Sequence, residues 1–386
     1  MASFDHSAPL KSDELNYAKS ASVLLKDHTF TFIETTYPSV FVTPGLPFTL
    51  AGFMWTFRSY TSGLMAFRYF QALLNTCTLC FLFWIARKLF GEKTARWCAI
   101  LSILYVPDYY VVNTILTETI FRTFFFGLLL LLISAFEKPT RLSFFFIGVV
   151  WGLSCAFRPF LALFPLAVLA SWLLQRRPLL LGLRYCYLCV AGFALVMSPW
   201  WIRNAITFHK FIPFSAATGL PLLAGSYINN RTDQVYDKYK VMIKTVENDA
   251  IAKTEAKARI KRVFNAEPAK YTEWYTIGKT RALWENPFYW RNAFGLSLAL
   301  VTAFHTFLVV TGFCGLLHSL VFQFRNSSLL SLTLAYYTLM YLPFVCFERY
   351  NYPGFGLFIL FAALALKLIF TAQPPTHTQQ STVKTN

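Results

Sequence analysis

Long apolar runs dominate this sequence and constrain its fold more than any other feature. A helix that crosses a bilayer needs about 20 mostly apolar residues, or fewer where neighbouring helices cover it. About nine runs meet this need, and they lie near residues 65–90, 95–113, 117–136, 142–157, 160–174, 182–202, 293–322, 329–347 and 353–371. The sequence therefore predicts an all-α, polytopic membrane protein of about nine transmembrane helices.

The composition supports a membrane environment. Of the 386 residues, 56% are hydrophobic and 14% are charged, whereas a soluble protein carries about 25% charged residues. So few charges cannot coat a water-facing surface, which excludes a soluble enzyme. The 41 Phe and 10 Trp are typical of a chain whose apolar side chains face lipid and whose aromatic residues gather at the membrane interfaces.

The distribution of basic residues predicts the orientation in the membrane. The formal net charge is +17, and cations concentrate in alternate short connections, whereas the opposite connections near residues 108–116, 158 and 348–352 carry few. The basic side should be cytoplasmic. We therefore expect the N-terminal segment, the loop at 204–292 and the turn at 348–352 to lie together outside. Topology and an anionic ligand account for the charge, so we expect no nucleic-acid partner.

These features divide the chain into five parts. An extracytoplasmic loop with an amphipathic helix and an acidic pair is followed by six transmembrane helices, a second extracytoplasmic loop with surface helices, three more transmembrane helices and a disordered cytoplasmic tail. Their ranges are 1–64, 65–203, 204–292, 293–372 and 373–386. About sixty residues precede the first run without a signal peptide. We therefore expect that the natural protein has a further N-terminal spanning helix, or that the start codon is misassigned.

An acidic pair opens the N-terminal amphipathic segment. In the stretch KSDELNYA, Asp13 and Glu14 precede apolar residues at helical spacing. This spacing predicts a short helix on the membrane surface with both carboxylates at its start. Two interpretations remain open for the pair. The carboxylates can take part in catalysis, or they can stabilise the helix N-terminus through the helix dipole.

Five arginines are expected at the outer ends of the predicted spans, on the side that should be poor in cations. They are Arg58, Arg68, Arg158, Arg203 and Arg349. Because the planar guanidinium group binds phosphate bidentately, a phosphate ligand would explain their position. For any single arginine, a side chain that reaches up to the interface remains an alternative.

The cysteines and acidic residues predict no certain cofactor. All eight cysteines lie in or beside apolar runs, and the C-x-x-C pairs at 77/80 and 186/189 lack further ligands, so we expect neither disulfides nor a cysteine metal site. Asp13, Glu14 and Glu118 could gather a divalent ion, but carboxylates dispersed along a sequence are a weak signal. A divalent metal therefore stays possible.

Several motifs occur in an order that resembles the lipid-dependent glycosyltransferases of the GT-C fold, specifically the group that contains the protein O-mannosyltransferases and the lipid A aminoarabinose transferase. The similar segments, in chain order, are SDELNYAKSASVLLKDHTFTF, TPGLPF, FRYFQALLNTCTLCFLFWIARKLFG, LTETIF, GLSCAFRPFLALFPL, SPWWIRNAITFHKFIPFSAATG and FERYNYPGFGLFIL. The resemblance extends over nearly the whole chain, since the segments lie between residues 12 and 360. We expect the family's first helix and its larger soluble C-terminal domains to have no counterpart in the printed sequence.

The resemblance implies a membrane glycosyltransferase that moves a sugar from a polyprenyl-phosphate donor to an acceptor hydroxyl of a glycan, lipid or protein. Asp13 would be the general base of an inverting reaction, with Glu14 as its neighbour in the acidic pair. The expected substrate-binding and lipid-phosphate-binding residues are Arg68, Arg203, Arg349, Glu118 and Tyr17. The site would lie on the extracytoplasmic side of the plasma membrane, in contact with membrane lipids. A transporter or flippase of an anionic or lipid-linked substrate, or a truncated inactive homologue, remains an alternative.

Overall fold

The structure is a computed structural model that describes Leu10, residues 12–230 and residues 245–371. The described residues form helices and no β-sheet, since the β-type pairing among them is one isolated bridge between Phe32 and Glu34. This confirms the fold class. The expected tail at 373–386 lies outside the described residues.

Helices follow one another with short connections through the first half of the chain. They are α1 (Ser12–Asp27), α2 (Gly45–Thr56), α3 (Tyr60–Phe90), α4 (Glu92–Leu104), α5 (Val106–Val111), α6 (Glu118–Glu137), α7 (Arg141–Phe157), η1 (Pro159–Leu163), α8 (Phe164–Leu174) and α9 (Leu179–Phe208).

The second half begins with shorter helices and ends with three long ones. They are α10 (Gly219–Gly225), η2 (Ile228–Asn230), α12 (Thr245–Ala266), α13 (Pro268–Glu273), the π-helix η5 (Trp274–Gly278), α14 (Lys279–Trp284), α15 (Leu298–Phe322), α16 (Phe324–Tyr341), η6 (Glu348–Tyr350), η7 (Tyr352–Gly354) and α17 (Gly356–Thr371).

Each of the nine apolar runs contains a helix, and the chain is a multi-pass membrane protein. Four helices of the described chain, α3, α6, α9 and α15, are long and apolar enough to cross a membrane, and the η6–η7 segment with α17 forms a fifth candidate that bends by 60°. The expected second span is interrupted at Tyr105, between α4 and α5, and Pro107 lies in the first turn of the next helix. A total of nine spans therefore stays a prediction.

Helix α6 is central and α9 is peripheral. In their most apolar windows, 72% of the α6 residues are buried, against 6% for α9. Where α9 packs against α7, Gly148 lies directly on the backbone of Cys189, so that a side chain at this position would overlap it. Small residues allow such close approach of membrane helices.

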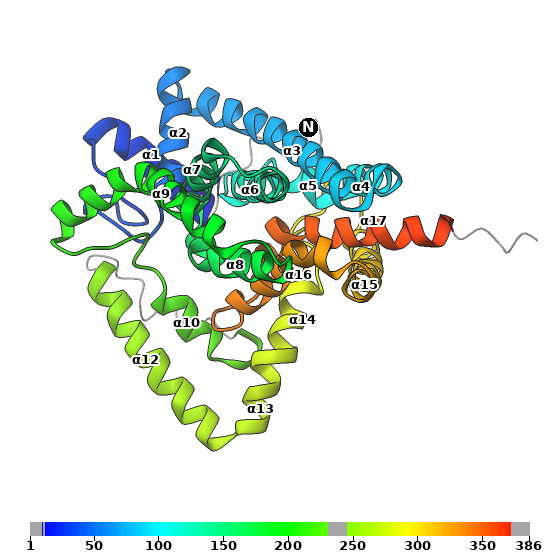
Figure 1. Cartoon of the computed structure of the whole chain (residues 1–386). Helices are drawn as coiled ribbons and strands as arrows, with labels where there is room; N and C mark the ends of the chain where they lie inside the picture. The colour runs from blue at the N-terminus through cyan, green and yellow to red at the C-terminus, as the bar shows by residue number, and fades with distance from the viewer. Residues whose placement is uncertain (1–9, 11, 231–244, 372–386) are drawn as a thin grey trace, which may run out of the picture.

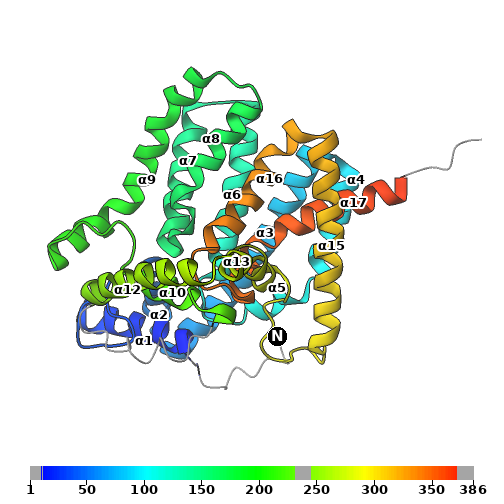
Figure 2. The same ribbon diagram turned by 90° about the horizontal axis from the view of Figure 1, so that it is seen from below.

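A layer of helices lies across one end of the upright bundle. Figure 2 shows α1, α2, α10, α12 and α13 at the same end of α6, α7 and α9. Figure 1 shows that α1 and α2 lie beside α7 and α9, while α12 and α13 extend away from them. The N-terminal segment and the loop at 204–292 therefore meet at one end, where α1 and α12 are helical. Their place at a membrane surface stays a prediction.

Candidate functional site

Three distant parts of the chain meet at the Arg349 side chain in this end layer. Arg349, in η6, donates from Nη1 to Asp13 Oδ2 of α1 at 2.7 Å. Its Nε donates to Oε1 of Glu118, the first residue of α6. The Asp13 side chain is 42% exposed and the Glu118 side chain is fully buried. One guanidinium group therefore joins an accessible carboxylate to an inaccessible one.

A second guanidinium group binds the same carboxylate oxygen of Glu118. Arg158 Nη2 donates to Glu118 Oε1 at 2.6 Å, and Arg158 Nε donates to Thr117 Oγ1 at 3.0 Å. Arg158 stands between α7 and η1 in an extended conformation, which the following Pro159 favours over a helical one. Burial alone would lower the pKa of Arg158, but the Glu118 carboxylate more than offsets this and raises it. Arg158 therefore stays cationic beside the site.

Glu14 and Arg68 lie on one flank of this cluster. Glu14 Oε1 accepts a hydrogen bond from the Ile115 backbone N–H at 2.9 Å, and Arg68 Nε donates to the Asn113 carbonyl at 3.0 Å. Gln71 donates to the carbonyls of residues 112 and 114 in the same loop. These side chains of α1 and α3 hold the loop that leads into Glu118, and neither Glu14 nor Arg68 forms a salt bridge with the described residues.

Tyr17 lies one helical turn after Asp13 on the buried side of α1. Its ring packs against Phe32 with centroids 5.0 Å apart. Burial raises the pKa of the Tyr17 hydroxyl, and the negative charge of Asp13 raises it further. The hydroxyl therefore stays protonated at neutral pH and can act as a hydrogen-bond donor.

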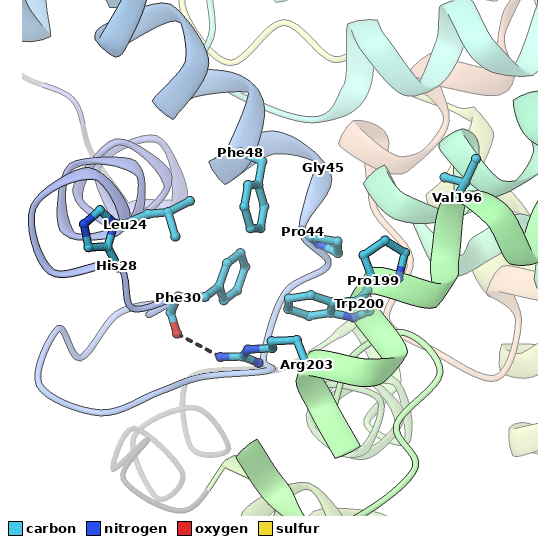
Figure 3. Close-up of a pocket in the computed structure, with 10 residues that line it drawn as sticks. All are labelled: Leu24, His28, Phe30, Pro44, Gly45, Phe48, Val196, Pro199, Trp200 and Arg203. Carbon is cyan, nitrogen blue, oxygen red and sulfur yellow. Dashed lines mark hydrogen bonds between the residues drawn. The ribbon is translucent and has the colours of Figure 1, made fainter. Parts of the chain in front are cut away.

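Arg203 lies in a separate pocket. Its Nη1 donates to the Ser39 carbonyl at 2.9 Å, and its Nη2 donates to the Phe30 carbonyl at 3.3 Å, the bond that Figure 3 draws. The guanidinium carbon is 5.0 Å from the centroid of the Trp200 ring. Figure 3 shows the mostly apolar wall of this cavity of about 360 Å³, which is lined by Leu24, His28, Phe30, Pro44, Gly45, Phe48, Val196, Pro199, Trp200 and Arg203.

The Arg203 pocket and the Arg349 cluster are linked through the end of α7. Gly45, in the pocket wall, lies directly on the backbone and ring of residues 156 and 157, so that a side chain there would overlap them. Thr43 Oγ1 donates to the Phe157 carbonyl at 2.9 Å. Because Arg158 is the next residue, one wall of the pocket is fixed to the segment that carries it.

A buried ion pair that was not predicted from the sequence lies beneath the cluster. Arg122, four residues after Glu118 on α6, donates from Nη1 to Asp108 and to the Tyr352 hydroxyl, the latter at 3.0 Å. Both charged side chains are only 1% exposed. Burying an ionisable side chain inside an apolar run costs free energy, so such a residue often marks a functional region. Arg122 within the run at 117–136 was therefore the sequence signal for this buried pair.

The carboxylates of the site do not form a metal centre in the described residues. No group of three or more His, Cys, Asp or Glu side chains suited to a metal ion occurs in residues 12–230 and 245–371. Asp13 and Glu118 are instead joined through Arg349, and Glu14 is bound to a backbone N–H.

Comparison with known proteins identifies the fold. Residues 42–202 match the family model described as dolichyl-phosphate-mannose-protein mannosyltransferase. The oligosaccharyltransferase of Archaeoglobus fulgidus in the apo form aligns with a TM-score of 0.56 and 12% identity, over 93% of this chain and 46% of that one. The same enzyme, AglB, in complex with an inhibitory peptide and a dolichol-phosphate aligns with a TM-score of 0.55, 12% identity and the same coverage.

ArnT from Cupriavidus metallidurans bound to undecaprenyl phosphate aligns more loosely, with a TM-score of 0.46 and 14% identity over 94% of this chain and 75% of that one. No curated protein matches the sequence. The chain spans about half the length of the archaeal oligosaccharyltransferase. The resemblance to the GT-C glycosyltransferases is confirmed, and the chain has the GT-C fold.

Proposed function

We propose that this protein is a membrane glycosyltransferase that moves a sugar from a polyprenyl-phosphate carrier to a hydroxyl group of a lipid, glycan or protein on the extracytoplasmic side. The family match of residues 42–202 supports the transfer of lipid-linked sugars in general. So does the fold shared with AglB, one structure of which is a complex with a dolichol-phosphate.

The observation that carries this proposal is the position of Asp13 against Arg349. The carboxylate is accessible, and the guanidinium that holds it is itself fixed by buried Glu118. A general base must lie within hydrogen-bond reach of the proton that it removes. Asp13 suits that role, because a substrate can reach its side chain and the ion pair with Arg349 sets the orientation of its carboxylate.

The arginines suit the departure of a phosphate. A polyprenyl phosphate leaves as a stable anion, so its departure needs stabilisation of charge more than a proton donor. Arg158 and Arg349 supply two cationic groups that share one carboxylate oxygen, Glu118 Oε1. Nη2 of Arg349 has no acceptor among the described residues, which leaves a donor for a phosphate oxygen. With one base and one leaving group in line, the reaction inverts the anomeric carbon.

The Arg203 pocket suits part of the carrier lipid. Its wall is mainly apolar, as an isoprenoid chain requires, and it is fixed to the segment that carries Arg158 (Figure 3). A carrier chain in this pocket would place its phosphate toward Arg158 and Arg349. Arg203 would then act at the rim of the lipid pocket, because its guanidinium already binds two backbone carbonyls.

The proposal is tested with the purified full chain reconstituted in sealed phosphatidylcholine liposomes and a panel of radiolabelled polyprenyl-phosphate sugars. We expect the release of polyprenyl phosphate from at least one donor, with transfer to an added acceptor or slowly to water. Movement of the intact donor across the bilayer without cleavage of any donor would contradict a transferase and support a flippase.

A further inference from the structure

A second cavity lies beside the segment that carries Arg349. Its volume is about 600 Å³, and it is bounded by the α13–η5–α14 segment on one side and by residues 346–348 on the other. This volume is within the range of small-molecule sites. Glu348 forms part of the wall, and the next residue, Arg349, binds Asp13 and Glu118. We call this space the Trp274 cavity, after the aromatic residue in its wall.

The local backbone is specialised at Trp274. The chain forms one π-helical turn from Trp274 to Gly278, a feature that is rare and often occurs at functional sites. Gly278 lies against the Trp274 ring, so that a side chain at 278 would overlap the indole. The π-turn and the glycine together hold the ring against the helix backbone in the cavity wall.

Trp274 also holds an unsatisfied donor. The residue is only 7% exposed, and its indole N–H has no hydrogen-bond partner within the part of the chain that the structure describes. A buried donor without an acceptor is costly. An oxygen atom of a bound ligand would satisfy it.

The charges of the wall select the ligand. Arg281 forms two hydrogen bonds with Glu285, both of 2.8 Å, and Glu348 accepts one from the Trp290 indole at 2.5 Å. Lys270 is paired with Glu267 at 2.6 Å. Because the basic side chains of the wall have carboxylate partners, whereas Glu273 adds a further negative charge, the cavity disfavours an anion and suits a neutral ligand with many hydroxyl groups.

We propose that the Trp274 cavity binds a neutral sugar ring of the acceptor and so delivers its hydroxyl group toward Asp13. This inference rests on the proposed transferase function and names the acceptor class as a saccharide. The indole donates to a sugar oxygen, and the carboxylates of the wall accept hydrogen bonds from sugar hydroxyls.

Binding can be measured without any transfer reaction. The full chain in phosphatidylcholine nanodiscs, free of glycoside detergents, is titrated with the methyl α-glycosides of mannose, glucose and galactose, with N-acetylglucosamine and with inorganic phosphate, by saturation-transfer NMR. We expect at least one neutral sugar to bind. Trp274→Phe keeps the ring but removes the N–H, and it should weaken that binding about fivefold, as expected for one hydrogen bond.

Two further variants make the result decisive. Glu273→Gln, at an exposed position where a substitution is expected to cost little stability, should weaken sugar binding severalfold even if the Trp274 variant misfolds. Trp55→Phe, at an exposed tryptophan on α2, should leave binding unchanged. Binding of phosphate in preference to every sugar, binding of no sugar, or equal sugar binding by wild type and both cavity variants would overturn the inference.

Transfer kinetics separate this inference from the proposed function. If both are right, Trp274→Phe raises the KM for a saccharide acceptor about fivefold and leaves the KM for the donor unchanged. Sugar binding without cleavage of any donor would contradict the transferase alone. Transfer with an unchanged acceptor KM in Trp274→Phe and Glu273→Gln would contradict the acceptor site alone.

Discussion

Arg349 and Glu118 are 231 residues apart in the sequence, yet the Arg349 Nε donates a hydrogen bond to the Glu118 carboxylate. This bond joins the N-terminus of the central helix α6 to the turn that begins the C-terminal helical segment. Through the same guanidinium, α1 is bound as well. The cluster therefore ties the end layer to the bundle and, in our proposal, also places the base beside the phosphate.

Replacing Glu118 by Gln should destabilise the protein severely. The change removes the carboxylate that lies between two guanidinium groups and leaves both partly buried cations without it. Breaking a buried ion pair in this way costs about 3 to 5 kcal/mol. Thermal unfolding in nanodiscs measures the loss. Glu137→Gln, at the exposed far end of the same helix, is the control and should cost less than about 1 kcal/mol. Equal effects of the two changes would contradict the structural role of Glu118.

Arg349→Lys should preserve the fold and lose most of the transfer rate. A lysine keeps the charge but lacks the planar fork that binds Asp13 and Glu118 at once. We expect the rate of donor cleavage to fall by about 100-fold, comparable to the loss of one group that stabilises a developing anion. Arg262→Lys, at an exposed position on α12, should retain full activity. Wild-type turnover by Arg349→Lys would remove the guanidinium from the mechanism.

Lys279 should make the free energy of unfolding depend on alkaline pH. Burial lowers the pKa of its amine from 10.5 to about 8, where Nζ donates to the carbonyls of residues 342 and 344. Between these two pH values the unfolded chain binds more protons than the folded one, so stability rises with pH, by up to about 3 kcal/mol. Lys279→Met should abolish this rise. An identical pH dependence in wild type and variant would show that the amine does not titrate there.

Gly148→Val should separate α7 from α9. The added side chain would overlap the Cys189 backbone, and overpacking of this kind costs about 1 to 3 kcal/mol. Gly52→Ala on α2 is the matched control, because its new methyl group would meet open space, and an alanine in a helix interior is favourable by about 0.5 to 1 kcal/mol. Thermal unfolding of the two variants should therefore shift in opposite directions. A shift in the same direction would contradict the close packing of α7 on α9.

The helices were predictable because their signals are local. The apolar runs indicate α3, α6, α9 and α15, and the acidic pair followed by helical spacing indicates α1. The break at Tyr105 was not foreseen, since the run at 95–113 stays apolar through it and the only local signal is Pro107.

The site was predictable in its residue types but not in its pairing. Asp13 and Arg349 are 336 residues apart, and no periodicity relates two such positions, so their contact depends on how helices pack. For the same reason Arg158 was recognised only as a helix-end arginine and not as the partner of Glu118. Arg203, expected with the other arginines, belongs to another pocket because the C-terminal end of α9 places it beside residues 30 and 39.

The most direct test of the central claim compares Asp13→Asn with Asp27→Asn at the two ends of the same helix. Both changes remove one carboxylate from α1, but only Asp13 contacts Arg349. With a donor that the wild-type protein cleaves, we expect Asp13→Asn to retain the thermal stability of the fold within about 1 kcal/mol and to lose transfer to the acceptor by at least about 100-fold. Asp27→Asn should transfer at the wild-type rate. Transfer by Asp13→Asn at the rate of Asp27→Asn would contradict the assignment of Asp13 as the base.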